Sequence, residues 1–378
     1  MQIVADHKIP FLRGVLEPFA EIKYLPGREI TAQEVKKADA LIIRTRTKCD
    51  QDLLHGSSVK LITTATIGFD HIDCDYCQKE HIFWYNSIGC NASSVCQYIA
   101  SVLVQWAKSM GENLSEKTIG IIGVGNVGSR VSSFCHSLNM KVLQNDPLRE
   151  EREGNENFVS LNQLLEECDI ITLHTPLEKE GKYPTFHLAD ESFFKRVKKG
   201  LFFINSSRGE VVKTGALIEA FQQGSVSNFA LDVYEEEPQV QDFLLKNSFV
   251  STPHIAGYSL DGKANGTADC IHHIADFFDI APLRNWHPQS IPTPSQSQDI
   301  TIDVLGKSLE EVYSMAIIHS YDVLQDSKKL KENPERFESL REDYPVRREF
   351  PYFRVHLKNS SPQTSNVLRK IGFNVVEE

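Results

Sequence analysis

The stretch "TIGIIGVGNVGSRV", residues 118–131, combines a short apolar strand, a glycine-rich turn and the start of a helix. The spacing G-x-G-x-x-G is formed by Gly123, Gly125 and Gly128. Glycines at this spacing let the backbone approach a pyrophosphate. The first N–H groups of the helix, at Asn126 and Val127, face the phosphate charge. The stretch therefore predicts the phosphate-binding turn of a dinucleotide domain.

The strand that follows this helix, "KVLQND", ends at Asp146. A carboxylate at this distance from the turn accepts hydrogen bonds from the adenosine ribose hydroxyls and repels a 2′-phosphate. The cofactor is therefore predicted to be NAD, although Arg149 close by leaves NADP open.

Strand-like and helix-like segments alternate on both sides of the turn. Before it, strands are predicted in "IVA", "EIKYL", "ALIIR", "KLITTAT" and "IFWYN", and after it in "TIGIIG", "KVLQND", "DIITLHT", "GLFFINSS", "FALDV" and "FVSTPH". Such alternation predicts parallel sheets covered by helices on both faces. The fold class is therefore α/β, with two α/β units and a doubly wound sheet in the second.

Shorter signals mark helix starts and boundaries. Thr31 and Glu34 have the spacing of a capping box, and residues 91–110 read as a long apolar helix. The segment 287–298 contains three prolines without periodicity and is predicted to be a linker. The last 80 residues alternate strands and helices in a small α+β unit.

Composition excludes some function classes. The chain has 378 residues and a net charge of −11, and such a surface repels a phosphate backbone, so no nucleic-acid partner is expected. No apolar run approaches the roughly 20 residues needed to span a bilayer, so no membrane partner is expected. With no signal-peptide pattern at the start, the expected location is the cytoplasm.

The eight cysteines are spread thinly and predict free thiols rather than a disulfide framework. One segment, "DHIDCDYCQKEH", spaces His71, Cys74, Cys77 and His81 as a zinc site could. The same letters also indicate a turn that opens a short helix, which would scatter the four side chains. No metal is therefore predicted, and a zinc-bearing interaction protein stays open as an alternative.

Polar residues follow three successive strands of the second unit. They are Arg208 in "NSSRGEVV", Asp232 and Glu237 in "LDVYEEEP", and His254 in "STPHIAGYS". Carboxyl ends of parallel strands line the ligand crevice of a doubly wound sheet. A histidine paired with a carboxylate can take a hydroxyl proton, and an arginine can hold a carboxylate in two hydrogen bonds. Together they predict dehydrogenation at a hydroxyl-bearing carbon.

Each of these residues taken alone has an ordinary structural interpretation. Arg208 could cap a helix, Glu237 could be a solvated acid, and His254 could be a core histidine. Their occurrence at successive strand ends favours the catalytic interpretation.

The four motifs "GIIGVGNVG", "NSSRGEVV", "ALDVYEEEP" and "TPHIAGYS" resemble the D-isomer-specific 2-hydroxyacid dehydrogenases over roughly residues 1–285. The resemblance implies that Arg208, Glu237 and His254 are catalytic. It also implies NAD contacts at Gly123, Gly125, Asn126, Val127, Gly128, Asp146, Thr175, Ser206, Ser207, Asp232 and Gly257.

The family also implies a domain arrangement. A Rossmann-type cofactor domain, residues 93–257, would be inserted into a flavodoxin-like substrate domain formed by residues 1–92 and 258–285. Residues 286–378 would form a C-terminal dimerisation domain, making the protein a homodimer.

The segments "LIIRTRTKC", "TATIGFDHID", "GCNASSV" and "PHIAGYS", together with a tail containing "YPVRREF", resemble a branch of this family that acts on a phosphorylated 2-hydroxy acid. The implied substrate contacts are Thr45, Thr66 and Tyr258, and Thr45 stands where the branch usually has serine. The basic residues Arg44 and Arg46 suit a phosphate, with a solvated basic loop as the alternative.

The tail raises two further expectations. Its apolar residues predict a self-associating face: Ile300, Ile302, Val304, Val312, Ile317, Ile318, Phe353, Val355, Leu357, Phe373 and Val375. The cluster Arg347, Arg348 and Arg354 is predicted either to reach a partner's substrate cleft, with Arg348 on the phosphate, or to form a surface salt-bridge cluster. Other functions left open are a phosphoglycerate-like dehydrogenase and a non-catalytic NAD-sensing corepressor.

Overall fold

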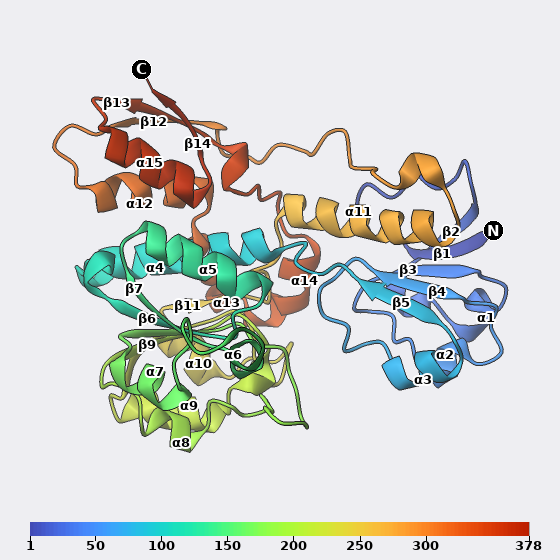
Figure 1. Ribbon diagram of the computed structural model, residues 1–378, viewed down its shortest axis with the longest axis horizontal. Coiled ribbons are helices and arrows are strands. Elements are labelled where there is room, and N and C mark those ends of the chain that lie inside the picture. The colour runs from blue at the N-terminus through green and yellow to red at the C-terminus, as the bar shows by residue number, and fades with distance from the viewer. Residues whose placement is uncertain (378) are drawn as a thin grey trace. The chain divides into compact units, whose positions relative to one another are not determined.

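The computed structural model describes residues 1–377, which divide into two compact units (Figure 1). The first unit holds residues 1–91 and 259–293. The second holds residues 92–258 and the tail from Pro294 onward. The chain therefore passes between the units three times.

The first unit is built on five parallel strands in the order β2-β1-β3-β4-β5, which is the flavodoxin-like order. The strands are β1 (Gln2–Asp6), β2 (Glu21–Leu25), β3 (Ala40–Ile43), β4 (Leu61–Thr64) and β5 (Phe83–Asn86). The helices are α1 (Ala32–Val35), α2 (Gln51–Leu54), α3 (Cys74–Lys79) and α11 (Leu260–Phe277).

Alternate residues of each strand face opposite sides of this sheet. Val4, Leu41 and Ile43 pack in one apolar cluster with residues of α1, α2 and α3. Ile3 and Ile42 pack in another cluster with residues of α11. Both faces are therefore covered, and the buried strands read as continuous apolar runs.

The capping box expected at Thr31 is not formed. Thr31 is the N-cap residue of α1, but its side chain makes no capping hydrogen bond. The Glu34 carboxylate instead accepts a hydrogen bond from Lys23 Nζ. The Glu34 carboxylate is thus paired with Lys23 of β2, whereas a capping box would pair it with the backbone N–H of Thr31.

The second unit contains six parallel strands in the order β11-β10-β9-β8-β6-β7. They are β6 (Thr118–Ile122), β7 (Lys141–Asn145), β8 (Ile170–Leu173), β9 (Leu201–Asn205), β10 (Val226–Leu231) and β11 (Val250–Ser251). The helices up to this point are α4 (Ala92–Met110), α5 (Asn126–Ser137), α6 (Pro147–Glu153), α7 (Leu161–Glu167), α8 (Glu191–Phe194), α9 (Thr214–Gln222) and α10 (Asp242–Asn247).

The strand order reverses between β6 and β8, so a ligand crevice is expected outside their carboxyl ends. A Rossmann sheet has a further strand beyond β7. Here Val159 N donates to Gln144 O at 2.8 Å, but this segment forms no strand in the described chain. The segment around Val159 thus runs beside β7 and donates one backbone hydrogen bond to it, in the place where a Rossmann sheet has its further strand.

The tail adds a second, three-stranded parallel sheet in the order β12-β13-β14. Its elements are β12 (Asp299–Asp303), α12 (Leu309–Ser320), α13 (Val323–Glu332), α14 (Phe337–Glu342), β13 (Arg354–Lys358), α15 (Pro362–Ile371) and β14 (Asn374–Glu377). Helix α12 packs on α4, and α15 packs on α5 (Figure 1).

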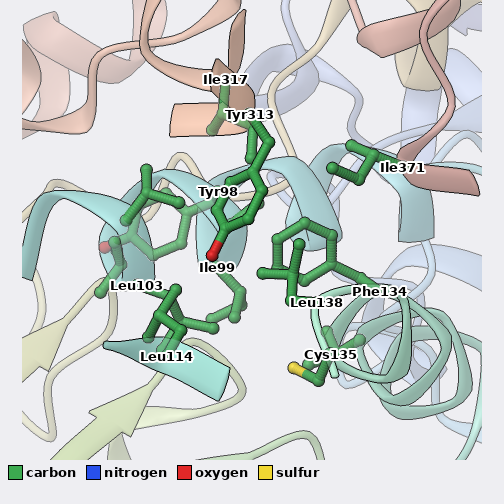
Figure 2. Close-up of a cluster of buried hydrophobic side chains, with 14 of the residues drawn as sticks. Tyr98, Ile99, Leu103, Leu114, Phe134, Cys135, Leu138, Tyr313, Ile317 and Ile371 are labelled. Carbon is green, nitrogen blue, oxygen red and sulfur yellow. The ribbon is translucent and has the colours of Figure 1, made fainter. Parts of the chain in front are cut away.

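The tail and the cofactor-type domain share one apolar core. Figure 2 shows Tyr313, Ile317 and Ile371 from the tail beside Ile99 and Phe134. Eight of the residues expected on a self-associating face are buried inside this chain: Ile300, Ile302, Val312, Ile317, Phe353, Val355, Leu357 and Phe373. That expectation is wrong for them, because α4 and α5 cover the apolar side of the tail.

Within residues 1–377 no helix combines the length and apolar character needed to cross a membrane.

Candidate active site

The glycine-rich turn joins β6 to α5 at the point where the strand order reverses. A Cβ on Gly128 would lie 2.0 Å from Gly123 O, and one on Gly123 would lie 2.8 Å from the carbonyl carbon of His174. Gly123 also has φ +83°. A Cβ on Gly125 would meet nothing within 4 Å. Gly123 and Gly128 are therefore required by close packing, whereas Gly125 borders open space.

Helix α5 begins at Asn126, with Gly125 as its N-cap and no side-chain cap. Because the first N–H groups of a helix have no acceptor inside it, Asn126 and Val127 present donors at this turn. The same end of the helix carries the positive end of the helix dipole. The turn is therefore suited to an anionic group such as a pyrophosphate.

Two buried hydroxyl groups near this edge lack partners. Thr175 follows β8 and Ser206 follows β9, and their Oγ atoms make no hydrogen bond with any described residue. An unsatisfied buried hydroxyl costs about 1–3 kcal/mol. A molecule bound at the carboxyl ends of the strands would supply the missing partners, so the residues present fit a dinucleotide.

The Asp146 carboxylate lies beside the glycine-rich turn. It accepts hydrogen bonds from Val124 N at 2.9 Å and from Arg149 N at 3.0 Å. The Arg149 guanidinium donates to both carboxylate oxygens of Glu153 and to Val124 O at 2.6 Å. Arg149 is thus held by groups of its own chain, so Asp146 supplies the negative charge that would face a ribose.

Asn205, the last residue of β9, shapes the turn that carries Arg208. Its Oδ1 accepts from Ser207 N at 3.0 Å and Ser207 Oγ at 2.8 Å, and its Nδ2 donates to Arg208 O at 2.9 Å. Arg208 Nη1 donates to Ser207 O at 2.9 Å. A buried amide therefore fixes the backbone on both sides of Ser207.

Close backbone packing brings the Arg208 turn to the segment that carries Glu237. A Cβ on Gly209 would lie 2.0 Å from the carbonyl carbon and oxygen of Tyr234. Tyr234 N in turn donates to Glu237 Oε1 at 3.0 Å. Only glycine permits this approach, and it places the turns after β9 and β10 against each other.

His254 and Glu237 form a hydrogen-bonded pair. His254 Nδ1 lies 2.9 Å from Glu237 Oε2. Burial raises the pKa of Glu237, but the hydrogen bond and the charge of His254 outweigh it, so the pKa lies below its ordinary value of 4.5. A carboxylate only accepts hydrogen bonds, so Nδ1 carries the proton. Nε2 is therefore the histidine nitrogen that can accept a proton.

Asp232 holds the segment on which His254 sits. Its side chain is 1% exposed, and it accepts from Ile255 N and Ala256 N, each at 2.8 Å, and from Thr252 Oγ1 at 2.7 Å. Burial raises its pKa, although these donors oppose the rise. The carboxylate thereby fixes the turn of Ile255–Tyr258, in which Gly257 lies.

The expected substrate contacts of the first unit follow its strands at their carboxyl ends. Thr45 follows β3 and is exposed, and Thr66 follows β4 with its hydroxyl donating to Gly68 O at 3.0 Å. Arg44 Nε pairs with the buried Asp6 carboxylate at 3.1 Å.

Arg46 belongs to a different environment from Arg44. It lines a cavity of about 380 Å³ together with Arg28 and Lys48, and Lys48 Nζ pairs with Asp50 at 2.7 Å. Arg44 does not line this cavity, so the two arginines have different surroundings, and their role toward a phosphate stays a prediction.

The three tail arginines do not form a surface cluster. Arg347 is 4% exposed and donates to Ser94 Oγ and to Ala256 O at 2.5 Å. Arg348 lies over the Tyr352 ring at 4.3 Å, and Arg354 pairs with Asp299 at 2.9 Å. Arg347 is used inside its own chain, so the expectation that it reaches a partner's cleft is wrong.

The proposed zinc ligands are also scattered. Cys77 is buried, Cys74 donates to Ile72 O, and His71 Nε2 lies 3.2 Å from Thr64 Oγ1. Burial lowers the pKa of His71 to about 4. In the described part of the chain no group of three or more His, Cys, Asp or Glu residues could hold a metal ion.

Sequence reasoning missed two contributors. Asn205 could have been found, because an asparagine at the end of a strand and before "SSR" is a typical Asx turn. Arg341 lies over the Tyr258 ring at 5.7 Å. Nothing in its local sequence separates it from the other arginines of the tail.

Comparison with known proteins identifies two families along the chain. Residues 94–256 match the family "D-isomer specific 2-hydroxyacid dehydrogenase, NAD binding domain". Residues 294–372 match a domain of unknown function, DUF3410.

Relatives that match over nearly the full length share one enzyme name, and a solved dehydrogenase structure has a similar fold. The chain is 49% identical over 350 residues to the erythronate-4-phosphate dehydrogenase of Bacteroides thetaiotaomicron, covering 92% of this chain and 97% of that protein. It is 39% identical to the enzyme of that name from Proteus mirabilis, over the whole of both chains. The D-lactate dehydrogenase of Aquifex aeolicus, solved with NAD and lactic acid, is 28% identical with a TM-score of 0.62, covering 77% of this chain and 100% of that chain.

Proposed function

Because the chain belongs to the D-isomer-specific 2-hydroxyacid dehydrogenase family, we propose that it oxidises 4-phospho-D-erythronate to 3-hydroxy-2-oxo-4-phosphooxybutanoate with NAD. This reaction belongs to the biosynthesis of pyridoxal 5′-phosphate. The observation that carries the proposal is the His254–Glu237 pair, in a chain 49% identical to a relative named for this activity.

His254 acts as the general base. Nδ1 donates to Glu237, so Nε2 accepts the proton of the substrate C2 hydroxyl. NAD held at the glycine-rich turn would supply the acceptor for the hydride that leaves C2. Glu237 stabilises the histidinium that forms, because its carboxylate stays ionised in the folded protein. Both electrons and the proton are thereby accounted for, and C2 becomes a carbonyl carbon.

Arg208 binds the substrate carboxylate and polarises the new carbonyl. A guanidinium matches a carboxylate with two parallel hydrogen bonds. The Asn205 amide fixes the turn that bears Arg208, and Gly209 sets that turn against the Glu237 segment. Thr45, Thr66 and Tyr258 complete the proposed substrate contacts.

The NAD contacts are proposed from the same edge of the sheet. The turn from Gly123 to Gly128 and the first N–H groups of α5 would hold the pyrophosphate. Asp146 would accept from the ribose hydroxyls. The unpartnered Oγ atoms of Thr175 and Ser206 would gain hydrogen bonds, and Ser207, Asp232 and Gly257 lie in the adjoining turns.

The activity is tested by following NADH formation with a panel of acids. We expect the highest kcat/KM for 4-phospho-D-erythronate, and lower values for D-erythronate, 3-phospho-D-glycerate and D-lactate. Preference for 3-phospho-D-glycerate would instead place the protein among phosphoglycerate-type enzymes. NADH binding without turnover of any acid would favour the sensing corepressor.

We propose that residues 286–378 dimerise the protein, which acts in the cytoplasm. Since most apolar residues of the tail are buried in its own chain, the candidate contacts are those left exposed: Leu305 at 75%, Met315 at 42% and Val376 at 39%. Replacing Leu305 and Met315 by Asp should convert a dimer to a monomer by light scattering while the fold is kept. An unchanged dimer would reject this surface.

A further inference from the structure

The tail places a cation beside the catalytic pair of its own chain. Arg341, in α14, has its guanidinium carbon 5.7 Å from the centre of the Tyr258 ring and 5.9 Å from that of Phe337. Phe337 in turn packs against Tyr234 at 6.0 Å. Tyr234 is the residue whose amide holds Glu237. Helix α14 is thus packed on the segment that carries the catalytic carboxylate.

The charge of Arg341 reaches Glu237. It is one of the influences that hold the pKa of Glu237 below its ordinary value, after burial, which opposes the shift, and the hydrogen bond from His254. The Glu237 segment, through Tyr234, and the His254 segment, through Tyr258, therefore both pack against α14.

The Arg341 guanidinium has unused hydrogen-bond donors. Its Nε is buried and has no hydrogen-bond partner among residues 1–377. A guanidinium carries five N–H donors, and the Arg341 guanidinium carbon lies over the Tyr258 and Phe337 rings, which accept no conventional hydrogen bond. In a chain of net charge −11, a half-buried guanidinium whose Nε lacks a hydrogen-bond partner among residues 1–377 is suited to an anionic ligand.

The surroundings of Arg341 are rigid. Tyr344 packs edge-on against Tyr258 at 5.9 Å, and its hydroxyl donates to the buried Asp326 carboxylate at 2.6 Å. Arg347 fixes the backbone of the same turn through Ala256 O. Arg341 and Tyr258 are therefore held on fixed supports, as a binding group requires.

We propose that Arg341 binds the phosphate group of the substrate, so that the tail completes the substrate site of its own chain. This inference rests on the proposed function. Arg208 takes the carboxylate at one end of the substrate, and Arg341 takes the phosphate at the other by a charge-assisted hydrogen bond. The residue would thus set the preference for a phosphorylated acid, and the site would need no arginine from a second copy.

The test compares three variants with two substrates. Arg341→Gln removes the charge, Arg341→Lys keeps it, and Arg336→Gln changes an exposed arginine five residues earlier as a control. For Arg341→Gln we expect KM for 4-phospho-D-erythronate to rise about 10- to 100-fold, the effect of losing a hydrogen bond to a charged group. The constants for D-erythronate should change less than about twofold. Arg341→Lys should restore part of the loss, and Arg336→Gln should match the wild type.

Other outcomes overturn the inference. If Arg341→Gln raised KM equally for both substrates, Arg341 would be only a structural support of Tyr258. If the kinetic constants of Arg341→Gln matched the wild type for both substrates, Arg341 would not belong to the substrate site. If the wild type does not turn over 4-phospho-D-erythronate, the proposed function fails, and anion binding is then tested separately. Inorganic phosphate should raise the melting temperature of the NAD-bound wild type but not of Arg341→Gln, and an equal rise in both would reject the phosphate site.

Discussion

The turns after β9, β10 and β11 and the arginine-rich segment before β13 are both rich in functional residue types, but only the turns bring theirs together. His254 is hydrogen-bonded to Glu237, and the Arg208 turn packs against the same segment. The tail arginines diverge, since Arg347 is buried and Arg354 pairs with Asp299. Parallel strands force their carboxyl ends to one edge, whereas neighbours along an irregular segment point in different directions.

The largest effect is expected for His254→Ala. Loss of a general base typically lowers turnover about 10²- to 10⁴-fold, while NADH affinity should stay nearly intact, because the glycine-rich turn is untouched. Steady-state kinetics and NADH fluorescence titration measure the two quantities. A loss of less than tenfold would show that the strand-end residues converge without acting as acid and base.

Arg347→Met tests the arginine-rich segment before β13, where Arg347 is buried. Ser94 Oγ and Ala256 O would each lose a buried donor, so we expect the free energy of unfolding to fall by about 2–4 kcal/mol. Arg354→Met, on an exposed ion pair, is the matched control and should cost less than about 1 kcal/mol. Urea unfolding measures both, and equal small losses would mean that Arg347 is not a buried support.

The glycine-rich turn offers a matched pair of substitutions. A Cβ on Gly128 would collide with Gly123 O, so Gly128→Ala should lower stability by about 1–3 kcal/mol. A Cβ on Gly125 meets open space, so Gly125→Ala should unfold like the wild type yet bind NAD more weakly. Thermal unfolding and calorimetric titration with NAD separate the two. Full NAD affinity in Gly125→Ala would place the pyrophosphate elsewhere.

The Glu237 pair predicts a pH dependence of stability. The pKa of Glu237 is lowered in the folded protein, so its contribution is present above its ordinary value of 4.5 and is lost as the pH falls through the lower folded value. Glu237→Gln should therefore unfold more easily than the wild type by about 1.5–3 kcal/mol at pH 7. The difference should shrink below pH 4.5. Urea unfolding at pH 7 and at a pH below 4.5 measures the difference in unfolding free energy between Glu237→Gln and the wild type. The same difference at both pH values would contradict the pairing of Glu237 with His254.

The smallest effect is expected for Asp146→Asn. Asparagine keeps a capping oxygen for α6 but removes the negative charge, so the preference for NAD over NADP should fall by about tenfold. The ratio of kcat/KM for the two cofactors is the measurement. An unchanged ratio would mean that Asp146 is only a helix cap.

Much of the fold could be predicted because its signals are local. Each predicted strand of the two large sheets is present, since buried parallel strands read as apolar runs between turn residues. The long helix at residues 91–110 is present as α4. The family and its NAD domain also followed from motifs, as the match over residues 94–256 confirms.

The burial of the tail could not be predicted in this way. Ile317 and Phe353 were expected on a self-associating face, because an apolar strand or helix face indicates that something covers it but not what does. The capping box at Thr31 failed for a related reason, since Lys23 of β2 competes for Glu34.

The sequence by itself determined the elements, the glycine turn and the residue types at each strand end, because backbone sterics, periodicity and turn chemistry act over a few residues. Only the tertiary structure decided which partners those residues meet. It buried Arg347 against the His254 turn, and it placed Arg341 over the Tyr258 ring. The physical reason is that an arginine's role depends on which acceptors its guanidinium reaches, and those acceptors lie far away along the chain.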